Sequence, residues 1–168
     1  MMLWIRVAIF TLLVPGFVAG WMPWWLLHSG REVRSFDPGV WRWAGLALAV
    51  AGVAGYVLCA LDFLLRGGGT PAIFFARHLR FLLGEEPQTV VQQGLYRHSR
   101  NPMYLSVICA TLGQGVFFGS GSVLLYGLAA FVFFHFVVVL AEEPHLRRKN
   151  GDSYREYCRR TSRWLPLK

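Results

Sequence analysis

The sequence predicts an all-α, polytopic membrane protein with about four transmembrane helices, a tight helical hairpin and a basic C-terminal tail. Hydrophobic residues make up 55% of its 168 residues and the mean hydropathy is +0.41, which is too apolar for an ordinary soluble domain of this length. Apolar stretches follow one another along the chain. Tryptophans, which anchor helices at membrane interfaces, lie mostly near the ends of these stretches: Trp4, Trp21, Trp24, Trp25, Trp41, Trp43 and Trp164.

The first apolar stretch runs from Leu3 to Leu27 and contains Pro15-Gly16 near its middle. We interpret it as a kinked transmembrane helix, because Pro and Gly are tolerated in such helices. A secretory signal peptide is the alternative interpretation, with Arg6 before the apolar core and Val18-Ala19-Gly20 as the small-residue cleavage site.

The second apolar stretch, Val40 to Leu65, would rise roughly 39 Å as a helix, which is enough to span a bilayer with some tilt. Its small residues, Gly45, Gly52 and Gly55 among them, favour close packing against another helix. Asp62, near the end of the stretch, lies either at the membrane interface or in a polar pocket.

A connector that begins with helix-breaking residues separates the second and third apolar stretches. Arg66-Gly67-Gly68-Gly69-Thr70-Pro71 ends the preceding helix, and it is not a phosphate-binding loop because the Lys-Ser/Thr pair of that motif is missing. Ile73 to Leu83 mixes aromatic and basic residues, which predicts an amphipathic helix lying in the membrane interface. Glu85-Glu86-Pro87 ends that helix.

Two further apolar stretches, Met103 to Gly119 and Val123 to Ala141, are joined by Gly119-Ser120-Gly121-Ser122. So short a link predicts a tight antiparallel hairpin. The third stretch is shorter than the roughly 20 residues of a typical span. We therefore divide the single membrane domain into two N-terminal helices (1–66), a cytosolic connector (67–102), the hairpin (103–141) and the tail (142–168).

The charge distribution predicts the orientation in the membrane. Four spans would place both termini and the connector on one side, which then holds fourteen Lys and Arg residues against three on the other. The positive-inside rule makes that side cytoplasmic. The same rule and attraction to anionic lipid explain the basic tail, so nucleic acid is not an expected partner.

Cys59, Cys109 and Cys158 form no CxxC pair, and neither a disulfide framework nor a metal site is expected.

Glu142-Glu143 closes the fourth stretch and needs a cation nearby. Two adjacent carboxylates at the end of an apolar run are unfavourable unless paired or hydrated, and they face the negative end of the helix dipole. Arg147 or Arg148 on the next turn would suffice for an ordinary ion pair. His135, seven residues before Glu142, is expected on the same helix face.

A hairpin returns to the membrane face that it left, so Pro102 and Glu142 should lie at one face. That brings the basic and aromatic residues before the third stretch close to the paired acids. A site with both signs of charge and tyrosine rings would suit a zwitterionic, aromatic cofactor that carries a sulfonium group. The alternative is a basic collar that only anchors the helix. The residues in question are Tyr96, Arg97, His98, Arg100, Asn101, Pro102 and Tyr104.

The motifs from residue 94 to residue 168 carry a family resemblance. In order they are Gly94-x-Tyr96-Arg97-x-x-Arg100-Asn101-Pro102-x-Tyr104, the apolar hairpin, Glu142-Glu143, Gly151-x-x-Tyr154-x-x-Tyr157 and Arg163-Trp164-Leu165-Pro166. This series resembles the membrane methyltransferase family that includes isoprenylcysteine carboxyl methyltransferase and the phospholipid N-methyltransferases. Asn101 stands where the carboxyl methyltransferases usually have a histidine, although Arg-Asn-Pro is a familiar variant among bacterial relatives, and we expect a bacterial inner membrane.

The resemblance implies S-adenosylmethionine as methyl donor, bound by the hairpin and tail at the cytosolic face, with a lipophilic or lipid-headgroup acceptor arriving from the bilayer. We expect catalytic roles for Arg100, Asn101 and Glu142. The full set of predicted cofactor-binding residues is Tyr96, Arg97, His98, Arg100, Asn101, Pro102, Tyr104, His135, Glu142, Glu143, Tyr154 and Tyr157.

Two other functions are compatible with the sequence. A non-catalytic membrane scaffold could keep the fold and use the paired acids only in ion pairs. A small transporter is the other alternative, supported by Asp62, His135 and Gln114 at intramembrane positions.

Overall fold

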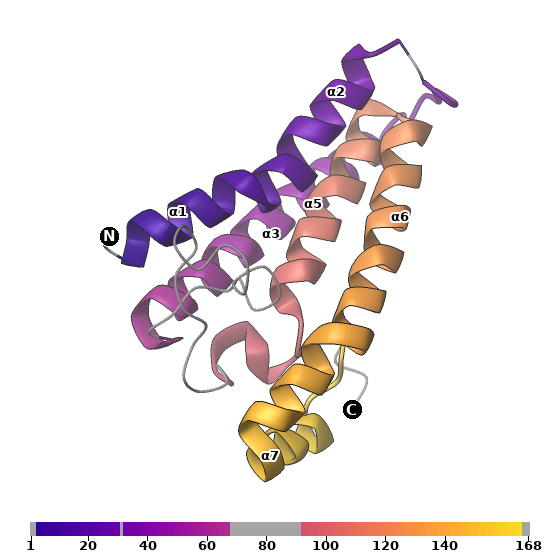
Figure 1. Cartoon of the computed structure of the whole chain (residues 1–168). Coiled ribbons are helices and arrows are strands. Elements are labelled where there is room, and N and C mark those ends of the chain that lie inside the picture. The colour runs from indigo at the N-terminus through magenta and orange to yellow at the C-terminus, as the bar shows by residue number, and fades with distance from the viewer. Residues whose placement is uncertain (1–2, 31, 68–91, 166–168) are drawn as a thin grey trace.

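The computed structural model describes residues 3–30, 32–67 and 92–165, and within these ranges it forms helices and no strand (Figure 1). The N-terminal half contains α1 (Leu3–Leu13), the π-helical turn η1 (Phe17–Trp21), α2 (Met22–His28), α3 (Trp41–Asp62) and the π-helical turn η2 (Phe63–Gly67). The C-terminal half contains the 3₁₀ turn η3 (Gly94–Arg97), α5 (Pro102–Phe118), α6 (Gly121–Val137), the π-helical turn η4 (Val138–Glu142) and α7 (Glu143–Arg160). The all-α prediction is confirmed.

Three helical segments are long and apolar enough to cross a membrane, and α5 is a shorter apolar helix. The first two are Trp4–His28 and Trp41–Leu65. The third begins at Gly121 and continues for 40 residues to Arg160. Such a helix would be roughly 60 Å long, twice the thickness of the hydrocarbon core, and its last part is the polar α7. The spanning part therefore ends near Ala141, and the chain is an integral membrane protein.

The first span is irregular where Pro15-Gly16 predicted a kink. Regular α-helix ends at Leu13, next to Pro15, which has no N–H to donate, and the π-helical turn η1 follows at Phe17–Trp21. The Gln114 side chain on α5 donates from Nε2 to the Ala19 carbonyl oxygen at 2.8 Å. This hydrogen bond ties the irregular turn to the hairpin.

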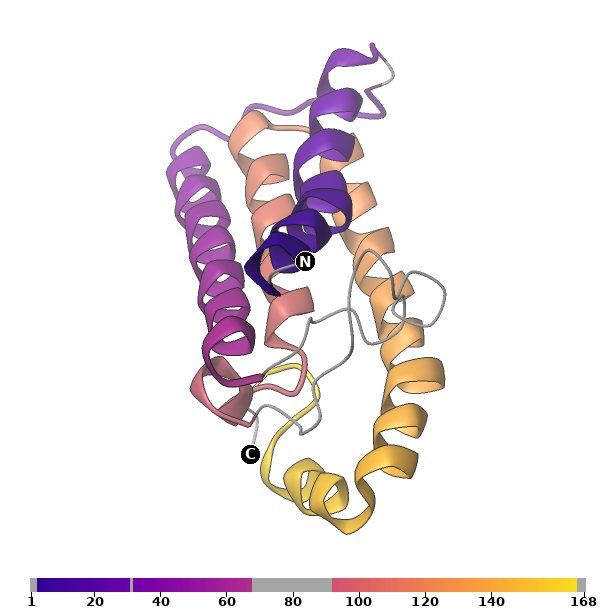
Figure 2. The ribbon, with the colours of Figure 1, turned by 60° about the vertical axis from the view of Figure 1, so that its left-hand side comes forward.

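Helices α3 and α5 pack closely along small residues (Figure 2). A Cβ atom at Gly45 would lie 2.7 Å from the backbone nitrogen of Phe117, and one at Gly52 would overlap with the backbone of Ala110. Gly113 of α5 meets the backbone of Ala49 in the same way. The packing role predicted for the α3 glycines is therefore confirmed, and it fixes the position of α5.

Replacing Gly52 with alanine should lower the free energy of unfolding by about 1–3 kcal/mol, because the added methyl group must push two helix backbones apart. Thermal unfolding of the detergent-solubilised protein measures the change. Gly20→Ala is the matched control, since a Cβ there meets no atom within 4 Å. Equal stability of both variants would show that the contact between α3 and α5 is not tight.

The hairpin turn is held from outside by the loop between α2 and α3. Gly119 adopts φ 64, which favours glycine, and Ser120 caps α6 by accepting a hydrogen bond from the Val123 backbone. Glu32 accepts from the Ser120 hydroxyl at 2.7 Å and from the Ser122 backbone at 2.9 Å. The loop therefore fastens the end of the hairpin that lies away from the C-terminus (Figure 1).

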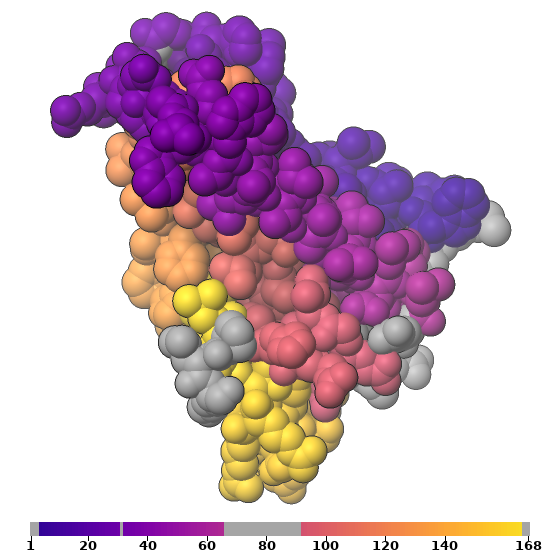
Figure 3. Space-filling view, turned by 180° about the vertical axis from the view of Figure 1, so that it is seen from behind, coloured from indigo at the N-terminus to yellow at the C-terminus, as the bar shows by residue number. Residues whose placement is uncertain are grey.

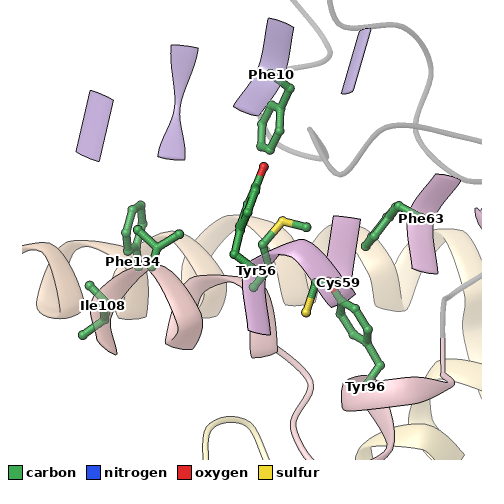
Figure 4. Close-up of a cluster of buried hydrophobic side chains, with 9 residues drawn as sticks. Phe10, Tyr56, Cys59, Phe63, Tyr96, Ile108 and Phe134 are labelled. Carbon is green, nitrogen blue, oxygen red and sulfur yellow. The ribbon is translucent and has the colours of Figure 1, made fainter. Parts of the chain in front are cut away.

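The hydrophobic core lies between α1, α3, α5 and α6 (Figure 4). Cys59 is fully buried in it, as expected for a small hydrophobe in an apolar stretch. The cluster of buried side chains consists of Phe10, Tyr56, Cys59, Phe63, Tyr96, Met103, Val107, Ile108 and Phe134. Tyr96 of η3 belongs to this cluster, so the segment before α5 is anchored in the core.

Most of the connector lies outside the described residues. The glycine-rich break at 68–71, the amphipathic helix at Ile73–Leu83 and the Glu85-Glu86-Pro87 stop fall in 68–91 and stay predictions. At its described end, Gly94 has φ 59, and a Cβ there would overlap with the Asp62 carboxylate. Asp62 therefore packs against the η3 turn at the end of α3.

Candidate active site

The Arg100–Tyr104 segment and the paired acids meet at one end of the hairpin, as its topology predicted. Pro102 is the first residue of α5, where its missing N–H removes no helical hydrogen bond. Glu142 and Glu143 lie where η4 passes into α7. Arg100 contacts Glu143, and Tyr104 contacts Glu142, so each side of the hairpin end supplies half of the cluster.

Two adjacent acids are both buried where the π-helical turn η4 meets α7. Neighbouring residues of an α-helix point about 100° apart, so the two carboxylates face different surroundings. Here the backbone N–H of Glu143 bonds to the Val138 carbonyl oxygen, five residues back, and Pro144 has no N–H to restore the regular pattern. Glu142 and Glu143 are only 6% and 4% exposed.

Glu143 is the centre of an ion-pair cluster. It accepts two hydrogen bonds from Arg163, at 2.7 and 3.1 Å, and one from Arg100 at 2.9 Å. Arg147 lies 3.6 Å away, so the ordinary i,i+4 ion pair is present as well. Burial alone would raise the pKa of Glu143, but the Arg163 hydrogen bond and the charges of the three arginines outweigh it and hold the pKa below its usual range.

Glu142 has a different environment from its neighbour. Its carboxylate accepts a hydrogen bond from the Tyr104 hydroxyl at 2.5 Å. The Tyr104 ring in turn packs on Phe134 of α6, with 4.7 Å between ring centroids. Burial raises the pKa of Glu142 to about 7, although the Tyr104 hydrogen bond and the charge of His145 act in the opposite direction. At neutral pH this carboxyl group can therefore take either charge state.

Arg100 has one donor that the described residues leave without a partner. Its terminal NH1 donates to Glu143 and to the Cys158 sulfur, each at 2.9 Å. Its Nε is buried and has no hydrogen-bond partner among the residues that the structure describes. A buried donor of this kind is unfavourable unless something accepts from it, so the position suits an anionic oxygen of a ligand.

A C-terminal strap, residues 161–165, runs beside the segment that leads into α5. The Arg100 backbone donates to the Ser162 carbonyl oxygen at 2.9 Å, and the Ser99 hydroxyl donates to that of Arg163 at 3.2 Å. The Asn101 side chain also donates to the Arg163 carbonyl oxygen, at 3.0 Å. Asn101 therefore holds the strap in place, which brings the Arg163 side chain to Glu143.

The tail tyrosines fasten α7 to the same end of the molecule. Helix α7 is interrupted at Gly151, whose φ of 54 and ψ of −125 turn the chain back toward η3. Tyr154 and Tyr157 are both buried, and the Tyr157 hydroxyl donates to the Tyr96 carbonyl oxygen at 2.7 Å. Tyr96 packs edge-on against Phe63 in the core. Tyr96 and Tyr157 therefore have packing roles in the structure, whereas Tyr154 lies beside Arg100 and Cys158.

Three of the predicted site residues lie apart from the acids. Arg97 and His98 are exposed to the surface, which fits the surface position considered for His98. His135 lies on α6, before the π-helical turn η4 that leads to Glu142. Its Nδ1 accepts a hydrogen bond from the Trp164 indole at 3.2 Å.

The two residues that attach the strap, Arg163 and Trp164, were not predicted as site residues, although both belong to the Arg163-Trp164-Leu165-Pro166 motif. Arg163 binds Glu143 through two hydrogen bonds, and Trp164 packs on Phe131 and His135 of α6. The Arg163-Trp164 pair was visible as part of the resemblance. A tail of eight basic residues gave no sign of which one reaches a buried acid.

Comparison with known proteins supports one family. Residues 50–153 match the model of the phospholipid methyltransferase family, which is more than half of the chain. The match includes Arg100, Asn101 and the paired acids, and it ends before the strap. A search of the curated proteins finds no match.

Proposed function

Because the chain belongs to the phospholipid methyltransferase family, we propose that it transfers a methyl group from S-adenosylmethionine to a lipophilic or lipid-headgroup acceptor. The observation that carries this proposal is that two contacts, Arg100 with Glu143 and Tyr104 with Glu142, lie at one end of the hairpin. A buried carboxylate and a buried arginine donor without a partner in the described part of the chain suit a zwitterionic ligand.

Each residue has a binding or positioning task in this proposal. The Glu142 carboxylate attracts the positive charge of the cofactor, and Tyr104 orients that carboxylate. The Nε of Arg100 donates to an anionic oxygen. Glu143 and Arg163 fix Arg100 in place rather than contacting the cofactor themselves. Asn101 acts through the strap.

When bound, S-adenosylmethionine would supply a methyl group attached to a positively charged sulfur. The protein's contribution is alignment and exclusion of water, which require no covalent bond to the enzyme. The buried cluster supports this part of the proposal, because its side chains are held by hydrogen bonds and lie beside an apolar core. The acceptor class, whether amine, carboxylate or thiol, is left open.

The affinity for S-adenosylmethionine should depend on pH through Glu142. The pKa of this carboxyl is about 7 in the folded protein and 4.5 ordinarily. The ionised form should bind the cofactor, so we expect affinity to fall about tenfold per pH unit below 7 and to level off above it. The free protein should show the opposite trend, losing stability as pH rises from 4.5 to 7, because in that range the folded state holds more protons than the unfolded state.

Titration calorimetry and thermal unfolding between pH 5.5 and 8.5 would measure the two trends. Glu142→Gln cannot titrate at this position, so both trends should be absent from the variant and should appear in the difference between wild type and variant. The same pH profile in wild type and variant would assign the titration to another group.

The proposal places the site and both termini on the cytoplasmic side, where the fourteen Lys and Arg residues would lie. Reporter fusions in the α5–α6 turn, at Ser120, and after Lys168 should report opposite sides of the membrane. Reporters on one side would rule out four spans with a cytoplasmic tail.

Methyl transfer is tested by incubating purified protein with methyl-labelled S-adenosylmethionine and a bacterial lipid extract. The proposal predicts label in the lipid phase that depends on protein and is lost in Arg100→Gln. A non-catalytic scaffold is the second candidate, favoured by the ion pairs of Glu143, which need no ligand to explain them. Absence of label with folded protein, across lipid and small thiol acceptors, would favour the scaffold.

A further inference from the structure

An apolar groove of about 470 Å³ lies between α3 and α5. Figure 3 shows the residues of α3 and α5 side by side on the face seen from behind. Small and aliphatic side chains line the groove, including Ala51 and Ala54 of α3 and Leu105 of α5. Trp164 of the strap and His98 also line it. Its volume is in the range of sites that hold small ligands.

The groove lies on the side of α5 away from the paired acids, and Pro102 borders both the groove and the candidate active site. Its α5 residues, Pro102, Leu105, Ser106 and Cys109, are spaced three and four apart and therefore share one face of the helix. Tyr104, which binds Glu142, points about 200° away from Pro102 around the helix. The body of α5 therefore stands between the groove and the acids.

The length of the groove and the basic residues at one end indicate what kind of ligand would fit it. On α3 it extends from Leu48 to Leu58, roughly 15 Å along the helix axis, and it lies between a helix long and apolar enough to cross a membrane and the shorter apolar helix α5. At the end nearest α5's first residue it meets His98, and the adjacent Arg97 is exposed with no ion-pair partner among the described residues. An alkyl chain fits the apolar length, and an anionic headgroup complements the basic end.

We propose that this groove binds one acyl chain of an anionic phospholipid, whose phosphate lies against Arg97 and His98. Such a lipid would be a resident component of the fold rather than one of the exchanging lipids around it. It would also contact Trp164, and so would support the strap that carries Arg163 to Glu143.

Native mass spectrometry of the full chain tests this site. The protein is stripped of lipid in detergent and then given phosphatidylglycerol or phosphatidylcholine with identical acyl chains. We expect one phosphatidylglycerol to be retained at least about fivefold more than phosphatidylcholine, in line with roughly 1 kcal/mol for a basic residue near an anionic headgroup. Arg97→Gln should remove that preference. Ala54→Phe, which fills the groove from an exposed position, should reduce retention of both lipids.

Matched controls use exposed residues elsewhere. Arg148→Gln on α7 removes a charge, and Ala129→Phe on α6 adds the same bulk, and both should retain lipid as the wild type does. Thermal unfolding of each variant shows whether it is folded. Equal retention of the two lipids by the wild type would overturn the proposal. So would full retention in folded Ala54→Phe, or equal losses in the control variants.

Discussion

Replacing Glu143 with alanine should destabilise the folded protein by roughly 3–5 kcal/mol, the effect expected when one partner of a buried ion pair is removed. The Arg100 side chain is only 11% exposed and would lose the carboxylate that compensates its charge. Arg163 would lose both hydrogen bonds that attach its side chain to the acid. We therefore expect the strap to loosen before the membrane helices unfold.

Thermal unfolding in detergent measures the loss of stability, and proteolysis of the tail reports the strap. Arg147→Gln is the matched control, because Arg147 is 58% exposed and lies 3.6 Å from the same carboxylate. That change should alter stability by less than about 1 kcal/mol, as for most exposed ion pairs. If Glu143→Ala were no more harmful than Arg147→Gln, the buried cluster would not be what holds the tail.

Replacing Glu142 with glutamine should weaken S-adenosylmethionine binding about 10- to 100-fold, which corresponds to the loss of one charge-assisted hydrogen bond. Glutamine keeps the size of the side chain and can still accept from the Tyr104 hydroxyl, so the fold should be retained. The expected loss of affinity therefore comes from removing the negative charge. Stability at pH 8 should not fall, because a buried neutral group replaces a buried anion.

The affinity of the variant is measured by titration calorimetry at pH 8, where most wild-type Glu142 is ionised. Glu156→Gln provides the control, since Glu156 is an acid on the outer part of α7 that pairs with Arg160. Tyr104→Phe should give a smaller loss than Glu142→Gln, because it removes only the group that orients the carboxylate. Wild-type affinity in Glu142→Gln would remove Glu142 from the cofactor site.

The sequence predicted the helices and their arrangement because both follow from local patterns. Long apolar stretches define the spans, a four-residue link forces a hairpin, and a hairpin must bring Pro102 and Glu142 to one end. The glycines of α3 predicted a close helix contact without identifying its partner. The structure supplies α5 as that partner.

The different roles of the two adjacent glutamates could not be predicted in the same way. Glu142 and Glu143 are chemically identical, and only η4 and the position of Arg163 make one a buried titrating acid and the other the centre of an ion-pair cluster. The strap pairs residues about 60 positions apart through single hydrogen bonds, which leave no periodic pattern in the sequence. The direction of the Asn101 side chain depends on that strap.

Saturation binding of S-adenosylmethionine to the purified full chain tests the account most directly. We predict one saturable site per chain at pH 8, displaced by S-adenosylhomocysteine, retained in Glu156→Gln and weakened in Glu142→Gln. Folded wild-type protein that shows no saturable binding, or binding that S-adenosylhomocysteine does not displace, would contradict it.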